Sequence, residues 1–179
     1  MFATRRRFTM RTLLATLVVG VGVGTAFAEK PTSTGHVSDA GKYSVVFPAK
    51  PTKVDADKAV ATASGNVTVI TSKYESGNVV YSVTYTDYPE SFKEVSPTRL
   101  LDGVVNGMKG TDGDLRATES FDVEGGAGRS VTILAGENVV RAKLYLQGRR
   151  LYLVQVSGKR DATNGKTADD FLASFHLAK

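Results

Sequence analysis

The stretch VVRAKLYLQGRRLYLVQV, residues 139–156, decides the fold class of this chain. Its first part, 139–147, alternates between apolar and polar side chains with a period of two, as a half-buried strand requires. The apolar face comprises Val140, Ala142, Leu144 and Leu146. The second part, 151–156, is apolar on both faces, which is typical of a central strand in a covered sheet. Gly148, Arg149 and Arg150 join the two, so we expect an antiparallel hairpin with other elements packed on both faces.

Five further segments outside this stretch have the composition and alternation of strands and end at Gly, Pro or Asn residues. They are residues 43–47, 66–74, 79–87, 115–123 and 129–135. Ser76-Gly77-Asn78 is expected to be a three-residue hairpin connection. Together with 139–147 and 151–156, these segments predict about six to seven strands.

Two segments instead show the period of an α-helix. In residues 96–110 an apolar stripe repeats every three to four positions, Ser96 is placed to cap the first turn, and Gly110 to end the last. In residues 167–177 the stripe is formed by Ala168, Phe171, Leu172 and Phe175. The predicted fold class is therefore α+β, an antiparallel sheet packed with two helices.

The N-terminus, residues 1–28, has the three parts of a cleavable signal peptide. Four arginines precede an apolar run from Leu13 to about Gly24, and Ala26 and Ala28 provide the small residues that a signal peptidase fits. We expect cleavage after Ala28. The protein would then be exported to the periplasm or to the outside of the cell.

Other interpretations of this N-terminus are weaker. The apolar run is shorter than the roughly 20 residues of a membrane-spanning helix, and its glycines disfavour a packed helix. Thr4-Arg5-Arg6-Arg7-Phe8 resembles a twin-arginine signal, so the twin-arginine and general secretory routes both stay open. The chain contains no Cys, which excludes a lipoprotein anchor at the cleavage site.

Removal of residues 1–28 changes the charge of the chain. Four of its 23 basic residues lie there, which leaves 19 against 18 acidic residues. The basic whole-chain composition is therefore no argument for a nucleic-acid partner. Residues 29–40 are polar and contain Gly and Pro, so we expect a flexible lead-in. Residues 41–179 are then expected to form a single α+β domain.

The remaining positive charge gathers in residues 139–179, which carry a net charge of +5. The side chains that could form a basic strip are Arg141, Lys143, Arg149, Arg150, Lys159 and Arg160. Arginine forks suit carboxylates and phosphates, so the hypothesis is docking of an acidic protein or another anionic envelope partner. The alternative is a solvated outer face that keeps the sheet soluble.

No pattern in the sequence predicts a cofactor, a metal centre or a catalytic group. His36 and His176 lack a second ligand at metal spacing, and Asp112-Gly113-Asp114 lacks the rest of a calcium loop. Gly125, Gly126 and Gly128 lie between two predicted strands, where a hairpin is expected and not a phosphate loop. Asn66-Val67-Thr68 is a glycosylation sequon that bacterial export would leave idle.

The order of these elements resembles a known family. GKYSVVFPAKP at 41–51, a hairpin, one mid-chain helix, an antiparallel meander and DDFLASFHL at 169–177 are similar to small exported bacterial domains related to the PsbP-like family. The resemblance covers residues 41–178 and implies an α/β/α sandwich. Its best-known members assist photosystem II in the thylakoid lumen or bind a small GTPase. It implies a binding or accessory role without catalytic residues.

The function expected from the sequence is that of an exported, non-catalytic binding or accessory protein of the cell envelope. Two alternatives remain open. One is an envelope hydrolase whose site is assembled from residues far apart in the sequence. The other is a purely structural or stress-related envelope component. The sequence leaves the oligomeric state and the identity of the partner open.

Overall fold

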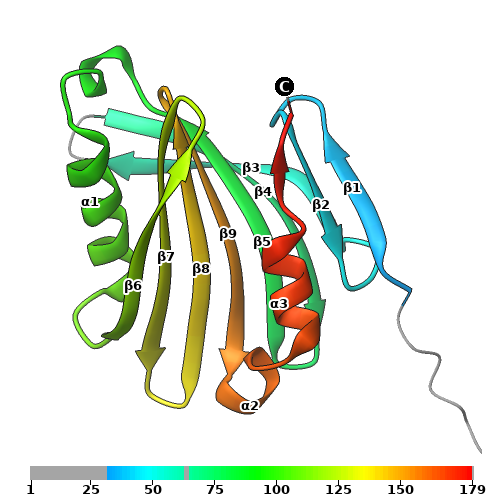
Figure 1. Cartoon of the computed structure of the whole chain (residues 1–179). Helices are drawn as coiled ribbons and strands as arrows, with labels where there is room; N and C mark the ends of the chain where they lie inside the picture. The colour runs from blue at the N-terminus through cyan, green and yellow to red at the C-terminus, as the bar shows by residue number, and fades with distance from the viewer. Residues whose placement is uncertain (1–31, 63–64, 179) are drawn as a thin grey trace, which may run out of the picture. The chain divides into compact units, whose positions relative to one another are not determined.

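The computed structural model describes residues 32–62 and 65–178. Within these residues the chain forms a seven-stranded and a three-stranded antiparallel sheet with helices between and beside them (Figure 1). The predicted signal peptide, with Ala26 and Ala28, lies outside the described residues.

The seven-stranded sheet has the order β3-β4-β5-β9-β8-β7-β6, and every neighbouring pair is antiparallel. Its strands are β3 (Lys53–Thr62), β4 (Gly65–Ser76), β5 (Val79–Asp87), β6 (Asp114–Val123), β7 (Gly126–Ala135), β8 (Asn138–Gln147) and β9 (Arg150–Lys159). Strand β9, which contains the two-sided apolar run 151–156, is fourth of the seven. The prediction of a central strand is confirmed.

Both faces of β9 are covered, because its side chains alternate between two hydrophobic clusters. Tyr152, Val154 and Val156 belong to a cluster with β2, β5 and α3. Leu151 and Leu153 belong to a second cluster with α1, β7 and β8. Figure 1 shows α3 over β5 and β9, and α1 beside β6 and β7. The sheet therefore lies between two layers of packed structure, as the sequence predicted.

The mid-chain helix α1 (Pro97–Lys109) has the predicted ends. The Ser96 side chain accepts a hydrogen bond from the amide of Arg99, and Gly110, at φ 62°, follows the last turn. Leu100 and Leu101 are buried against the sheet. The predicted apolar stripe therefore faces the core.

The C-terminal helix is shorter than predicted. Helix α3 (Lys166–Ala173) stops before Ser174, and His176–Leu177 forms the short strand β10 instead of a last helical turn. The Ser174 hydroxyl accepts from the amide of Val46 at 2.9 Å, which ties the helix end to β2. Phe175 is buried although it lies beyond the helix, because β10 pairs with β2 and turns it inward.

The three-stranded sheet has the order β1-β2-β10, with β1 (Thr34–Ser38) and β2 (Tyr43–Phe47) antiparallel over five residue pairs. The prediction that residues 29–40 form a lead-in without regular structure is wrong for residues 34–38. Their polar composition masks a strand in which His36 and Ser38 turn inward. Ser38 is 2% exposed.

Sequence periodicity also missed three other elements. Strand β3 is exposed over residues 53–60, and four of these residues are charged, so no apolar alternation marks it as a strand. The one-turn helices η1 (Glu90–Phe92) and α2 (Arg160–Thr163) are too short for a period to show. The predicted three-residue connection at 76–78 is a two-residue turn, because Ser76 pairs with Val79.

Candidate functional site

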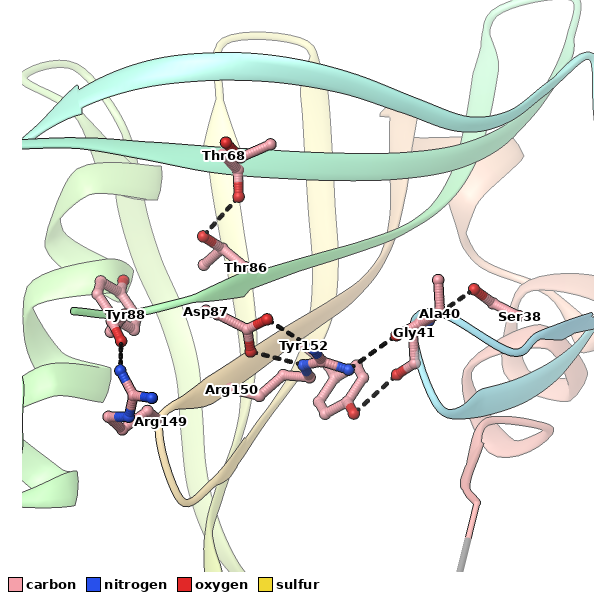
Figure 2. Close-up of polar contacts among 10 residues, drawn as sticks. All are labelled: Ser38, Ala40, Gly41, Thr68, Thr86, Asp87, Tyr88, Arg149, Arg150 and Tyr152. Carbon is pink, nitrogen blue, oxygen red and sulfur yellow. Dashed lines mark hydrogen bonds and ion pairs between the residues drawn. The ribbon is translucent and has the colours of Figure 1, made fainter. Parts of the chain in front are cut away.

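The candidate site lies at the end of the large sheet where β5 ends and β9 begins. Asp87 and Arg150 face each other as cross-strand partners, and the Tyr88 amide donates to the Arg149 carbonyl oxygen at 2.9 Å. Figure 2 shows the two neighbouring arginines diverging, Arg149 toward Tyr88 and Arg150 toward Asp87 and Ala40. The paired arginines of the sequence therefore have different surroundings.

Arg150 is a fixed structural group. Its Nε donates to Asp87 Oδ1 at 2.6 Å, its Nη2 to Oδ2 at 2.5 Å, and its Nη1 to the Ala40 carbonyl oxygen at 2.9 Å. The guanidinium also lies 5.2 Å from the centre of the Tyr85 ring. The hydrogen bond from Arg150 lowers the pKa of Asp87, and the same bond raises the pKa of Arg150.

Tyr152 completes the contact between the two sheets. Its hydroxyl donates to the Gly41 carbonyl oxygen at 2.8 Å, and burial raises the pKa of the phenol. Arg150 and Tyr152 thus hold two successive carbonyls of the turn that joins β1 to β2 (Figure 2). Because the Gly41 carbonyl belongs to a buried residue and the Ala40 carbonyl to an exposed one, the Tyr152 bond satisfies a buried acceptor, and both bonds tie the small sheet to the large one.

Arg149 has a different environment, because its ion pair within the described residues is long and exposed. Its Nη1 donates to the Tyr88 carbonyl oxygen at 2.7 Å. The nearest acidic group is Glu90, with Oε1 at 3.7 Å from Nη2, and the Arg149 side chain is 41% exposed. A guanidinium has five N–H donors, so most of its hydrogen-bonding capacity remains open to a partner, and its charge is only weakly neutralised by Glu90.

Two pockets adjoin Arg149 and share it and Tyr88 as a wall. One, of about 370 Å³, is lined on its apolar side by Val67, Ile70 and Tyr85. The other, of about 270 Å³, is more apolar, and its lining includes Phe92, Val95, Leu100 and Leu146. We call Arg149, Tyr88 and these two pockets the Arg149 corner. It combines a partly exposed cation with a mixed polar and apolar pocket on one side and a mainly apolar pocket on the other.

The other predicted basic residues are distributed differently. Arg141 Nη2 contacts Asp169 Oδ1 at 2.6 Å, and its Nη1 donates to the Thr163 carbonyl oxygen at 3.1 Å. Lys159 pairs with Glu137 at 3.8 Å. Lys143 lies beside Arg141 in a pocket of about 260 Å³ near α3. Within the described residues, Lys143 and Arg160 have no ion pair.

The six residues therefore do not form one continuous strip. Arg150 and Lys159 are the first and last residues of β9, which places them about 30 Å apart at the rise of an extended strand. The sheet face that carries Arg141 also carries Tyr145 and Tyr152. Their rings pack against Phe175 and lie between the two ends of β9. Two separate basic ends result.

The candidate metal ligands stay apart in the described part of the chain. The ring of His36 packs near those of Tyr43 and Phe47, His176 is exposed in β10, and Asp114 pairs with Arg116 at 2.9 Å. No group of three or more His, Cys, Asp or Glu side chains able to hold a metal occurs among the described residues. In the same residues, no helix has the length and apolar character needed to cross a membrane.

The glycines at 125, 126 and 128 serve a hairpin, as expected. Gly125, at φ 72°, lies in the turn between β6 and β7. A Cβ at Gly126 would lie 1.7 Å from the Leu146 carbonyl oxygen, and one at Gly128 would lie 2.1 Å from the Phe121 ring. Close approach of the neighbouring backbone therefore requires glycine at position 126, whereas the Phe121 ring packs over Gly128.

The residues of the 88–95 loop that build the Arg149 corner carry no periodic pattern in the sequence and were not predicted. Tyr88 and Phe92 pack their rings 4.8 Å apart, and Lys93 contacts Glu90 at 2.6 Å. The four-residue spacing of two aromatic side chains after a strand, interrupted by Pro89, is the one local signal that could have marked this loop.

The sheet order, the two covering layers and the small N-terminal sheet define an α+β domain. No family model matches the chain, and no curated protein matches it. Among solved structures it is similar to the solution structure of cyanobacterial PsbP (CyanoP) from Synechocystis sp. PCC 6803, with a TM-score of 0.51 and 17% identity. The match covers 90% of this chain and 98% of that chain. The predicted PsbP-like fold is confirmed.

Proposed function

We propose that this chain is a non-catalytic binding protein of the cell envelope that docks an acidic segment of a protein partner at the Arg149 corner. The observation that carries the proposal is the unequal neutralisation of the two neighbouring arginines. Arg150 has both carboxylate oxygens of Asp87 within 2.6 Å, whereas the nearest carboxylate oxygen to Arg149 is 3.7 Å away.

The two adjoining pockets define the chemistry of the partner. A carboxylate that reaches Arg149 would bring its flanking side chains over Ile70 on one side and over Phe92 and Leu146 on the other. An acidic residue between two apolar residues therefore fits this corner better than an acidic residue in a fully charged segment. Buried apolar anchors beside an arginine are typical centres of binding energy in protein interfaces.

Export remains part of the proposal and rests on residues 1–28. The basic start, the apolar run and Ala26 and Ala28 support a cleaved signal, by either the general secretory or the twin-arginine route. Mass spectrometry of the intact protein recovered from the cell envelope tests this. A mature N-terminus near Glu29 is expected, and a retained Met1 would refute the cleavage.

The docking test uses a single charge reversal, Arg149→Glu. The tagged protein is cross-linked in intact envelope, captured, and its partners are quantified by mass spectrometry against a mock control. The matched control is Arg160→Glu, which makes the same charge change at the other end of β9 without an ion pair in the described residues. A partner lost with Arg149→Glu and kept with Arg160→Glu supports the proposal.

Two other results would contradict docking at the Arg149 corner. A specific partner that Arg149→Glu and Arg160→Glu retain equally would place docking elsewhere on the surface. Turnover of an envelope polymer or ester by the purified chain, unchanged by Arg149→Glu, would favour the alternative of a hydrolase.

A further inference from the structure

The two edges of the seven-stranded sheet carry devices that prevent pairing with another chain. Strand β3 has a register shift between Lys53 and Ala56, and strand β6 has one between Leu115 and Ala117. Charged side chains line both strands: Lys53, Asp55, Asp57 and Lys58 in β3, and Asp114, Arg116, Glu119 and Asp122 in β6. Bulges and charges are the usual protection of exposed strand edges.

Strand β1, the edge of the small sheet, has neither device. Its sequence TGHVS contains no Lys, Arg, Asp, Glu or Pro, and its register with β2 is regular over all five residue pairs. Its outer edge pairs with no other strand within the described residues. The opposite edge of the same sheet, β10, has two residues and is too short to act as a template.

The outward face beside this edge carries two exposed valines, next to Ser44 and His176. Val37 in β1 is 70% exposed and Val46 in β2 is 42% exposed, the first being the most exposed large hydrophobic side chain among the described residues. Gly35 lies directly opposite Val46, and a Cβ built on Gly35 would meet no atom within 4 Å. An exposed valine and an open glycine therefore stand two residues apart on one face of the edge strand.

We propose that β1 pairs with β1 of a second copy of this chain, antiparallel, about a two-fold axis at His36. This axis is chosen because it pairs all five residues of β1 with the partner strand. It places Val37 of each copy opposite Gly35 of the other, and Val46 is the neighbour of that glycine on the next strand. The surface is thus complementary to itself, as a two-fold interface requires.

The pairing is expected to be weak. Five residue pairs and four valines bury less than the roughly 800 Å² per partner of a stable complex. The dimer therefore forms at high protein concentration and reverses on dilution. Its docking site is separate from the Arg149 corner, so the two proposals fail independently.

The chain contains no cysteine, which allows the register to be tested by cross-linking. In the proposed dimer, positions 35 and 37 of the two copies face each other about 5 Å apart, within disulfide reach. Position 35 of one chain lies about 8 Å from position 35 of the other chain, and the same holds for position 37. This distance is beyond disulfide reach. Gly35→Cys with Val37→Cys in one chain should give a covalent dimer on mild oxidation, and each single variant should not. Equal cross-linking by the single variants would overturn the register.

Sedimentation velocity tests the association itself. The protein is made from its complete coding sequence, its N-terminus is identified by mass spectrometry, and it is examined from about 10 µM to about 1 mM. The wild type is expected to show reversible dimer formation that Val37→Lys abolishes. The control, Val60→Lys, makes the same change on the edge strand β3 and should leave the dimer intact. A monomer at every concentration, or a dimer unaffected by Val37→Lys, would overturn the proposal.

Discussion

Arg150 holds both carboxylate oxygens of Asp87, with Nε to Oδ1 at 2.6 Å and Nη2 to Oδ2 at 2.5 Å. The bond crosses from the start of β9 to the end of β5, and the third donor of the same guanidinium reaches Ala40 in the turn before β2. One side chain thus joins two strands of the large sheet to the small sheet. Arg149, its neighbour in sequence, makes no such connection.

This difference predicts that the same substitution destabilises the fold much more at Arg150 than at Arg149. Arg150→Glu removes three hydrogen bonds and places a carboxylate beside Asp87, so it should lower the free energy of unfolding by about 2 kcal/mol or more. Arg149→Glu removes one hydrogen bond, to the Tyr88 carbonyl, and a long ion pair with Glu90, so it should cost only about 1 kcal/mol. Urea unfolding of the two variants provides the comparison, and equal losses would contradict the separate roles.

The lowered pKa of Asp87 predicts a loss of stability in acid. Its folded pKa lies below the value of about 3.9 for an unperturbed aspartate. The stabilisation is therefore complete above about pH 4 and disappears as the pH falls through the folded pKa. Asp87→Asn should cost about 1 kcal/mol at pH 7, and the difference from wild type should shrink as the pH falls below about 4. A difference that does not depend on pH would refute the ion pair as its source.

From the raised pKa of Tyr43 we predict a second effect of pH on stability, in alkaline solution. Burial raises the pKa of its phenol to about 12, whereas an unfolded tyrosine ionises near 10. The folded state then holds a proton that the unfolded state releases, so stability falls as the pH rises from about 10 to about 12. In Tyr43→Phe this part of the fall should be absent. Thermal unfolding at a series of pH values measures it.

At neutral pH, Tyr43→Phe is expected to be nearly neutral. The Tyr43 hydroxyl is buried without a hydrogen-bond partner in the described residues. The nearby hydroxyls of Ser38 and Ser72 donate to Asp55. Tyr152→Phe serves as the control, since it removes the 2.8 Å bond to Gly41 and should cost about 1 kcal/mol. A larger loss for Tyr43→Phe than for Tyr152→Phe would show that its hydroxyl is bonded after all.

The burial of Phe171 allows a prediction of how much the C-terminal helix contributes to the free energy of unfolding. Its side chain is 1% exposed and packs against the rings of Phe47 and Tyr81 at 5.2 and 5.4 Å. Phe171→Ala should cost about 3 to 5 kcal/mol. Leu115→Ala, at a side chain that is 36% exposed, should cost less than about 1 kcal/mol. Chemical unfolding of the two variants tests whether α3 covers the sheet as described.

The elements that the sequence predicted well are those whose apolar residues have a clear period. The alternation of 79–87 and 139–147, the two-sided run 151–156 and the capped stripe of α1 all reflect burial against one or two layers. β1 and β3 lack that period, since the inward residues of β1 include His36 and Ser38 and most of β3 is exposed. Their place in a sheet is decided by backbone pairing, which does not depend on apolar side chains.

The candidate site shows the same division. The sequence identified Arg149 and Arg150 as a pair and placed them at one end of a central strand, because spacing and turn residues are local properties. It could not show that Arg150 is neutralised by Asp87, 63 residues away, or that Arg149 stands between two pockets formed by the 88–95 loop. Local periodicity thus determined the class of fold and the candidate residues. Only the tertiary structure decided which charge is neutralised and which is open, because the distance between charges from distant strands sets their interaction.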